Sequence, residues 1–377
     1  MKWEKVKLGN VTDSCLGKML DQNKNKGDYQ PYLANVNVRW GEFDLEDLPL
    51  MKFEESEQER YELKYGDLVI CEGGEPGRCA IWKEQIPNMK IQKALHRVRV
   101  HDCLDYRYLF YWFLLAGKTG ELDQYFTGAT IKHMPGQKLK EVVIDKPPLE
   151  IQHRIADILS AYDDLIENNQ KQIKLLEEAA QRLYKEWFVD LRFSGHENTK
   201  IVDGVPEGWS RTNINEILTF HRGYDLTKNE MKAGRYPVVG STTVIGYHNE
   251  FKIKGPGIVT GRSGSLGKYQ FIWDNFWPHN TSLYISDYKD HNIFFVYSLL
   301  QTVDFASLNN GGAIPTLNRN VLSNIEVIEP TDELQEMFAT ITEAQYRKIR
   351  NLEKQNNQLK MARDVLLPKL MSGEVEV

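Results

Sequence analysis

Residues 147–187 read PPLEIQHRIADILSAYDDLIENNQKQIKLLEEAAQRLYKEW, and this stretch decides the fold. The two prolines at its start favour a helix that begins directly after them. Apolar residues then recur at alternating steps of four and three, which is typical of a coiled-coil seam and predicts a helix of roughly 60 Å. The seam residues are Ile151, Ile155, Ile158, Tyr162, Leu165, Ile173, Leu176, Ala180, Leu183 and Trp187.

A second stretch of the same kind begins after Pro330 and is broken at Pro368 and Gly373. Its seam residues are Leu334, Phe338, Ile341, Ile349, Leu352, Leu359, Ala362 and Leu366. Two long amphipathic helices in one chain pack most simply on each other. Because the chain must return between them, we expect an antiparallel pair. The alternative is that both helices pack inside one large domain.

The chain also repeats itself, and each copy is followed by one of the two helices. The matched segments are Trp3 and Leu8 with Trp209 and Ile214, 66–70 with 257–260, 73–78 with 263–268, 109–115 with 293–300, and 128–131 with 312–315. The offset falls from 206 residues at the first match to 184 at the last. The loops therefore differ between the copies while the framework keeps its order, which predicts related but non-identical tasks.

Outside the helices, short β-like runs alternate with Gly/Pro turns and a few helical segments, for example at 238–239, 258–259 and 268–273. We therefore predict an α+β protein. It has two mixed α/β globular domains separated by two long antiparallel coiled-coil helices, with a pseudo-two-fold internal repeat. The predicted boundaries are residues 1–148 for the first globular domain, 149–195 for the first long helix, 196–330 for the second globular domain and 331–377 for the second long helix.

The net charge of −6 does not suggest a nucleic-acid partner, but the charge is unevenly distributed. Residues 41–62 carry 9 acidic and 2 basic side chains. The rest of residues 1–148 carries 20 basic and 14 acidic ones, a net of +6. A binding face needs local positive potential rather than a basic total, so the composition leaves DNA binding open.

Cysteine usage and hydropathy indicate a cytoplasmic protein without a metal site or a membrane segment. The four cysteines, Cys15, Cys71, Cys79 and Cys103, form no C-x-x-C pair and fit no common zinc spacing, so we expect reduced structural thiols. Residues 1–5 show no signal peptide. The longest apolar run, 108–117, is about half the length that spans a bilayer.

Two motifs imitate catalytic sequences without meeting their requirements. Asp145-Lys146-Pro147-Pro148 inserts a lysine into the Asn/Asp-Pro-Pro-aromatic loop that an amino-methyltransferase needs. Between Gly261 and Gly267 there are five residues instead of the four of a phosphate-binding loop, and Tyr269 replaces the Ser/Thr that binds magnesium. We expect no catalytic residue, metal ion or cofactor in this chain.

Several polar residues are candidates for contact with DNA. Glycines let the backbone approach phosphates closely, and Arg78, Arg262, Ser263 and Lys268 belong to the two Gly-rich loops, which could equally be tight turns. Base reading needs side chains with paired donors and acceptors. The candidates for it are Lys132, His133, Asn280, Asn309, Asn310, Asn318 and Arg319, each of which could instead be a turn residue. Arg222 and Tyr224 could contact the DNA backbone.

The helical segments resemble those of type I restriction-modification specificity (S) subunits. The segments that carry the resemblance are 147–163, 183–188, 205–209 and 366–373. It covers nearly the whole chain, is specific at the helices and is loose within the globular domains. Some positions depart from the pattern: Trp3 lacks the Pro-Glu-Gly lead-in of Trp209, and the first half has no asparagine corresponding to Asn318.

The resemblance implies a non-catalytic, sequence-specific DNA-binding subunit. Each globular domain would be a target-recognition domain that reads one half-site on double-stranded DNA, and the helices would fix the gap between the half-sites. Two DNA methyltransferase (modification) subunits carrying S-adenosylmethionine would dock on the helices, and a separate restriction subunit would use ATP and Mg²⁺. The alternative function is a coiled-coil scaffold that assembles partner proteins without reading DNA.

Overall fold

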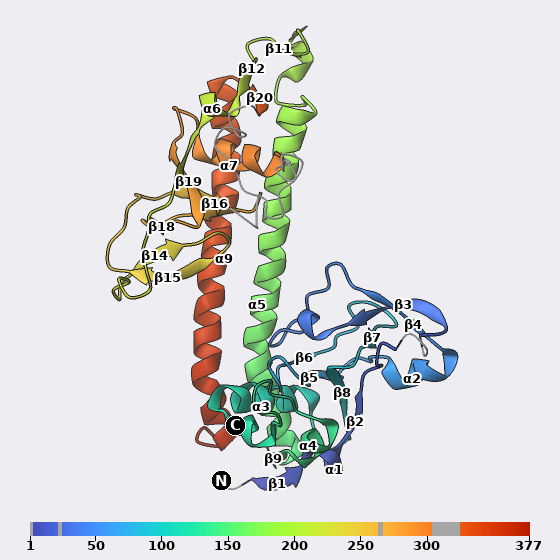
Figure 1. The fold of residues 1–377 in the computed structure, drawn as a ribbon. Coiled ribbons are helices and arrows are strands. Elements are labelled where there is room, and N and C mark those ends of the chain that lie inside the picture. Colours follow the sequence, from blue (N-terminus) through green and yellow to red (C-terminus); the bar gives the residue numbers. More distant parts are fainter. Residues whose placement is uncertain (1–2, 22–24, 263–266, 304–324) are drawn as a thin grey trace. The chain divides into compact units, whose positions relative to one another are not determined.

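The computed structural model describes residues 3–21, 25–262, 267–303 and 325–377. The chain divides into two compact units. Unit 1 comprises Met1–Asn168 and Gln355–Val377, and unit 2 comprises Asn169–Lys354. The long helices α5 (Leu149–Tyr184) and α9 (Asp332–Ser372) each contribute one segment to each unit (Figure 1).

Unit 1 holds the first copy of the repeat. Before α5 its elements are β1 (Glu4–Lys7), α1 (Leu8–Val11), β2 (Thr12–Leu16), β3 (Asp28–Leu33), β4 (Leu50–Phe53), α2 (Gln58–Tyr61), β5 (Leu68–Cys71), β6 (Cys79–Ile81), β7 (Lys90–Ile91), β8 (Leu95–Val100), α3 (Tyr106–Thr119), α4 (Gly136–Glu141) and β9 (Val143–Lys146).

Unit 2 holds the second copy. After α5 and a π-helical turn at Lys185–Val189, its elements are β10 (Ile201–Val202), β11 (Val205–Pro206), β12 (Ser210–Asn213), α6 (Ile214–Ile217), β13 (Thr219–Arg222), β14 (Tyr236–Val239), β15 (Val244–His248), β16 (Gly257–Gly261), β17 (Tyr269–Ile272), β18 (Trp277–Pro278), β19 (Ser282–Asp287), α7 (Ile293–Thr302) and β20 (Glu326–Glu329).

The two copies share one sheet topology. A four-stranded sheet has the order β2-β8-β5-β6 in unit 1 and β13-β19-β16-β17 in unit 2. A three-stranded sheet has the order β4-β3-β7 in one copy and β15-β14-β18 in the other, and the first and last strands pair as β1-β9 and β12-β20. The internal repeat inferred from the sequence is therefore a repeat of strand order as well.

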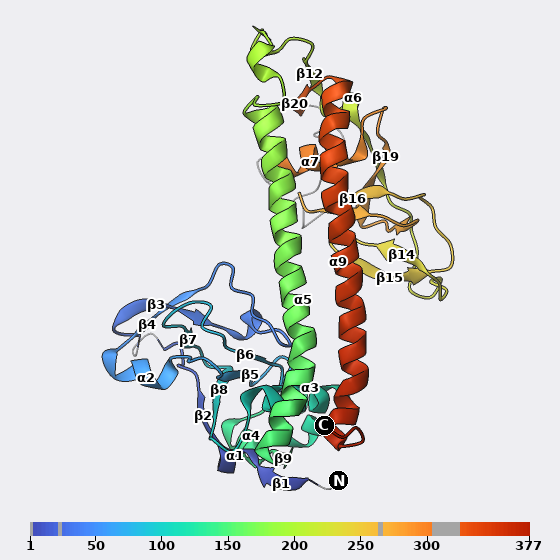
Figure 2. The same ribbon diagram turned by 180° about the vertical axis from the view of Figure 1, so that it is seen from behind.

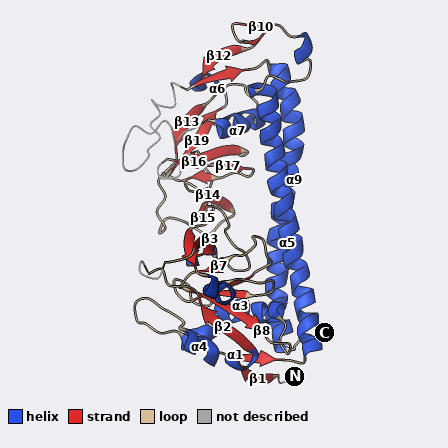
Figure 3. Cartoon of the chain, turned by 90° about the vertical axis from the view of Figure 1, so that its right-hand side faces the viewer, coloured by secondary structure: helices blue, strands red, loops and turns tan. Residues whose placement is uncertain are grey.

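One helix in each unit lies between the four-stranded sheet and the long helices (Figure 3). In unit 1 this is α3, whose buried residues share a core with Ile155 and Leu159 of α5 and Leu370 of α9. In unit 2 it is α7, whose Phe295 packs with Tyr184 of α5 and Phe338 of α9. The core of each copy thus continues directly into the helix pair.

The segments of α5 and α9 pack together within each unit (Figures 1 and 2). In unit 2, Tyr184 meets Phe338, while Glu177, two turns earlier in α5, lies near Glu353, farther along α9. In unit 1, Asp163 of α5 forms an ion pair with Arg363 of α9. The expected antiparallel pair and the α+β class with two β-rich domains are confirmed.

The expected seam of α5 is partly wrong. Ile158 and Leu165 are 37% and 48% exposed, whereas Leu159 and Ile166, one position later, are 0% and 5% exposed. The first half of α5 must cover α3 as well as α9, so its buried face is rotated relative to a simple two-helix seam. On α9, Ile341 is also exposed.

A buried glutamine fastens the start of each long helix. The Gln152 side chain donates to the carbonyls of Pro147 and Cys103 and accepts from the Asp105 N–H. Gln335 donates to the Pro330 carbonyl and contacts His291 Nδ1. These side chains are almost fully buried, so their hydrogen bonds are made away from water.

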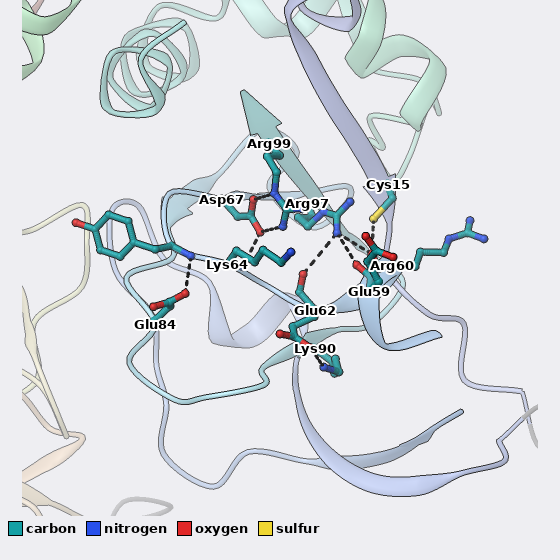
Figure 4. A network of polar contacts seen from close by, with 11 residues as sticks. Cys15, Glu59, Arg60, Glu62, Lys64, Asp67, Glu84, Lys90, Arg97 and Arg99 are labelled. Atoms are coloured by element: carbon teal, nitrogen blue, oxygen red, sulfur yellow. Dashed lines mark hydrogen bonds and ion pairs between the residues drawn. The ribbon is translucent and has the colours of Figure 1, made fainter. Parts of the chain in front are cut away.

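The acidic segment 41–62 of unit 1 is tied to the sheets by basic side chains. Figure 4 shows Arg97 of β8 donating to the backbone carbonyls of Glu59 and Arg60, and, just beyond the segment, Arg99 bound to Asp67 through two hydrogen bonds of 2.7 Å. The buried Lys90 ammonium pairs with Glu62 at 2.8 Å. Part of the acidity of this segment therefore compensates buried lysine side chains of the same unit.

Candidate nucleic-acid interface

Equivalent strand ends bring the same loops together in both units. Strand β3 pairs in parallel with β7 as β14 does with β18, so Leu33 corresponds to Val239 and Ile91 to Pro278. Gly17 N–H donates to the Leu95 carbonyl, as Gly223 N–H does to that of Ser282. A Cβ at either glycine would lie within about 2.4 Å of a backbone oxygen of the neighbouring loop, so glycine is required at both.

We name the surfaces that these loops form the loop faces. The loop face of unit 1 comprises residues 16–19, 34–37, 72–78, 92–94 and 127–133, and that of unit 2 comprises residues 222–225, 240–243, 262 and 279–281. Most of these segments are strand ends and the turns that follow them.

A polar cluster occupies the loop face of unit 2. Arg222 Nη2 lies 3.7 Å from Asp225 Oδ1, and the Asn280 amide donates to the same carboxylate. The side chains of Arg222 and Asp225 are 52% and 79% exposed. The cluster therefore presents a guanidinium, a carboxylate and an amide at the surface, which are groups that pair with base edges.

Tyr224 holds the loop of this cluster in place. Its hydroxyl lies 3.0 Å from that of Tyr284, and its backbone forms a parallel bridge with His279. Burial is the main reason why the pKa of Tyr284 is raised, and the hydrogen bond with Tyr224 adds to it. Tyr224 thus fixes the loop that carries Asn280, while its own side chain is only partly exposed.

Arg262 and Lys268 flank the second Gly-rich loop. The Arg262 N–H donates to the Thr281 carbonyl, so Arg262 lies next to Asn280 on the loop face. Lys268 is exposed, and its carbonyl accepts from Thr260 Oγ1. Five candidates from the sequence, Ser263, Asn309, Asn310, Asn318 and Arg319, lie outside the described residues.

The first Gly-rich loop, residues 73–78, is a hydrogen-bonded turn. The N–H groups of Glu75, Gly77 and Arg78 all donate to carbonyls between Cys71 and Glu75. Arg78 binds the side chains of Glu75 and Asn35 at 3.0 Å, and its own side chain is 16% exposed. This arrangement holds the turn at 34–37 against the Gly-rich loop.

Lys132 and His133 belong to an exposed loop beside that turn. Thr127 and His133 close the loop by exchanging two backbone hydrogen bonds, of 2.7 and 2.9 Å. His133 also bridges to Gly73, which places the loop next to residues 73–78. Lys132 Nζ lies 3.4 Å from Asp123 and above the Phe126 ring. The structure therefore brings Arg78, Lys132 and His133 together.

Sequence reasoning missed several residues of these faces. Lys93 occupies the position in unit 1 that Asn280 occupies in unit 2, because Lys93 follows the bridge Lys18–Gln92 as Asn280 follows Tyr224–His279. Asn35 and Ser241 each lie two residues beyond the matched strand ends Leu33 and Val239. The repeat offers a signal for these pairs, but the alignment requires the register of β3 and β14, whose sequences share little.

The described residues contain no group of three or more His, Cys, Asp or Glu side chains arranged to hold a metal ion. Burial raises the pKa of the Cys71 thiol to about 11 and raises that of Cys79 as well, so neither is a reactive thiolate. Over the same part of the chain, no helix is both long and apolar enough to cross a bilayer.

Comparison with known proteins gives one consistent family. The model of the type I restriction modification DNA specificity domain matches residues 1–178 and again 206–361. The MjaIX specificity subunit of a type I restriction enzyme from Methanocaldococcus jannaschii is 29% identical over 342 residues, which covers 83% of this chain and 78% of the relative. The MjaVIII specificity subunit from the same organism is 28% identical over 227 residues, or 59% of this chain and 50% of the relative.

The fold has a solved counterpart as well. The crystal structure of a type I restriction-modification S subunit from M. genitalium aligns with a TM-score of 0.60 at 19% identity, covering 98% of this chain and 96% of that one. The family model matches both copies of the repeat, each with part of its helix. The chain belongs to the type I restriction-modification specificity family and is the DNA specificity subunit, a non-catalytic component, of such a system.

Proposed function

We propose that each loop face reads one half of a bipartite DNA target. The observation that supports this proposal is the shared strand register. It brings three loops together in each copy, and these loops carry different side chains in the two copies. They are 16–19, 34–37 and 92–94 in unit 1, and 222–225, 240–243 and 279–281 in unit 2. A shared backbone with divergent loops suits two readers of unlike sequences. Exposed loops at strand ends can also enter a DNA groove, whereas sheet interiors cannot.

Individual roles follow from the geometry of each candidate. Arg222 and Asn280 would contact base edges, Lys132, His133, Arg262 and Lys268 would contact phosphates or bases, and Tyr224 would support Asn280. Arg78 would act chiefly by holding the turn that contains Asn35. Ser263, Asn318 and Arg319 remain candidates from the sequence alone.

The helix pair would set the gap between the half-sites. Residues 1–148 and 196–330 would be the recognition domains, and 149–195 and 331–377 the spacers. At about 1.5 Å per residue, the 36 residues of α5 are roughly 54 Å long, which is more than one turn of DNA. Helix length would then decide how many base pairs separate the half-sites.

The partner subunits would catalyse the methylation and cleavage of DNA. In the proposed complex two modification subunits hold S-adenosylmethionine, and a restriction subunit uses ATP and Mg²⁺. The complex would act on host DNA in the cytoplasm. The present chain would contribute recognition and geometry.

Selection from random DNA duplexes tests the reading function. The full chain, with and without its modification subunits, is expected to enrich two short motifs separated by a fixed gap. A scaffold that does not read DNA would enrich none. Sequencing the methylated positions in a host that carries both genes should return the same two half-sites.

The spacer role has a separate test. Deleting seven residues, about two turns, from each of α5 and α9 should shorten the gap and leave both half-sites unchanged. A deletion of similar length at 197–203, outside both spacers and without buried residues, serves as the control and should not change the gap. Altered half-sites with an unchanged gap would refute the spacer role.

A further inference from the structure

The two loop faces differ in chemistry at equivalent positions. In β2 and β13, Leu16 pairs with His96 and Arg222 with Leu283, so Leu16 corresponds to Arg222. Two residues beyond the essential glycines, Met19 corresponds to Asp225. The polar pair Arg222 and Asp225 of unit 2 is therefore replaced by two apolar side chains in unit 1.

The turn that follows β3 in unit 1 and the turn that follows β14 in unit 2 show a similar difference between apolar and polar side chains. Val36 of unit 1 and Thr242 of unit 2 both lie in the turn that begins after the matched residues Leu33 and Val239, although the connection to the next strand runs over 34–49 in unit 1 and over 240–243 in unit 2. The Val36 side chain is 69% exposed and that of Met19 is 55% exposed. Exposed apolar side chains indicate a partner surface where they gather on one face of the molecule, whereas single scattered ones do not.

A third apolar side chain stands on the neighbouring loop. Ile131 is 63% exposed at the tip of the loop that Thr127 and His133 close. Asn35, next to Val36, donates to the Gly73 carbonyl, and His133 bridges to Gly73 from the other side. Val36 and Ile131 therefore belong to one cluster of loops around Gly73.

Cationic side chains accompany these apolar ones. Lys132 follows Ile131 directly, and Lys93 occupies the position of Asn280. A surface with both lysines and exposed methyl groups suits the major groove of DNA, where phosphates border the 5-methyl groups of thymine.

We propose that unit 1 recognises its half-site through apolar contact of Val36, Ile131 and Met19 with thymine 5-methyl groups, whereas unit 2 recognises its own through hydrogen bonds. The inference rests on the proposed reading function and adds the chemistry of one reader. It requires the half-site of unit 1 to contain at least one thymine on the contacted strand.

Uracil-substituted DNA tests the proposal, because deoxyuridine pairs like thymidine but lacks the methyl group. The full chain, bound to its modification subunits, is titrated with the selected duplex containing uracil in one half-site at a time. We expect affinity to fall about fourfold for each contacted methyl group in one half-site and to stay unchanged for the other.

Variants of unit 1 test whether this unit reads the half-site that is sensitive to uracil. Val36→Thr keeps the shape of the side chain but replaces one methyl group with a hydroxyl, so it should reduce the difference between thymine and uracil by up to about fourfold, the contribution of one methyl contact. Val365→Thr is the matched control, because Val365 of α9 is 62% exposed, and it should leave that difference intact.

Several outcomes would overturn the inference while leaving the reading function in place. These are a bipartite motif with no sensitivity to uracil, a half-site of unit 1 without thymine, or uracil sensitivity that is lost in Asn280→Ala but kept in Val36→Thr. A loss of modification-subunit binding in Val36→Thr with unchanged thymine discrimination would make the surface a protein interface and also overturn it. Absence of any selected motif would instead refute the proposed function itself.

Discussion

The two units bury different kinds of side chain at equivalent positions. In unit 1, Lys18 and Lys90 are buried at positions where unit 2 has Tyr224 and Trp277. The lysines pair with Glu57 and Glu62 of the acidic segment, whereas the aromatic rings pack edge to face at 6.3 Å. Burial alone would raise the pKa of Glu57, but the hydrogen bonds from Lys18 and from the Glu54 N–H, together with the charge of Lys18, outweigh burial, so the pKa is lowered.

The comparison gives a physical reason for the acidic segment. A buried ammonium is costly without a carboxylate partner, and an aromatic side chain needs none. Residues 41–62 therefore supply charges that unit 2 does not require at the equivalent positions. One backbone register accommodates either solution, which leaves the exposed loops free to diverge.

The largest effect is expected from breaking one of these buried pairs. Glu62→Leu should lower the free energy of unfolding by about 2–4 kcal/mol, since it leaves the Lys90 ammonium buried without its carboxylate. The double variant Lys90→Met/Glu62→Leu should recover most of the loss. Denaturant unfolding measures both, and Glu46→Leu, in an exposed part of the same segment, is the control. A double variant as unstable as the single one would contradict the argument.

The glutamine at the start of each helix allows a second comparison. Gln152→Met removes three buried hydrogen bonds and should cost about 2–3 kcal/mol, while Gln335→Met removes two and should cost about 1–2 kcal/mol. Gln170→Met, at an exposed position of α5, should change stability by less than about 0.5 kcal/mol. Thermal and denaturant unfolding of the three variants should show this order; equal effects would argue against the assigned hydrogen bonds.

Equivalent residues of the two loop faces should differ in their effect on DNA. Asn280→Ala should weaken binding by about 1–2 kcal/mol and relax the base preference at one position of one half-site. Lys93→Ala should instead weaken binding to all sequences alike and reduce the salt slope by about one. Titrations with matched and mismatched duplexes at several salt concentrations distinguish these results. Loss of preference in the same half-site for both variants would contradict a division between the units.

The smallest effect is expected for acidic residues of the helix pair, whose pKa values are shifted in opposite directions in the two units. In unit 2, burial and the charge of Glu353 raise the pKa of Glu177. In unit 1, burial would raise the pKa of Asp364, but hydrogen bonds from Lys118 and Arg363 outweigh it and leave it lowered. Ionised Glu177 therefore destabilises the folded state above its raised pKa, and this cost disappears as the pH falls toward the unfolded value of about 4.3.

Glu177→Gln should accordingly raise stability at pH 7, by less than about 0.5 kcal/mol because solvent screens the partly exposed pair. It should also flatten the pH dependence of unfolding just above pH 4.3. Glu178→Gln, at the next exposed position of α5, is the control. Unfolding measured between pH 4 and 8 checks both statements; a stability loss at pH 7 in Glu177→Gln would reverse the sign of the argument.

Much of the architecture was predictable from local patterns. The helix pair follows from apolar periodicity and proline positions, which act within one segment of chain. The duplicated domains follow from matched segments such as those around Trp3 and Trp209. These features, together with the resemblance at the helices, led to the correct family.

The tertiary structure decided which side chains meet. The parallel bridge between Tyr224 and His279 places Asn280 beside Asp225, and α3 determines that Leu159 rather than Ile158 is buried. Such contacts depend on strands and helices far apart in the sequence, and a shift of one residue would reverse the faces. The sequence alone therefore determined the elements and their repeat, while the loop faces exist only because long-range strand pairing sets their register.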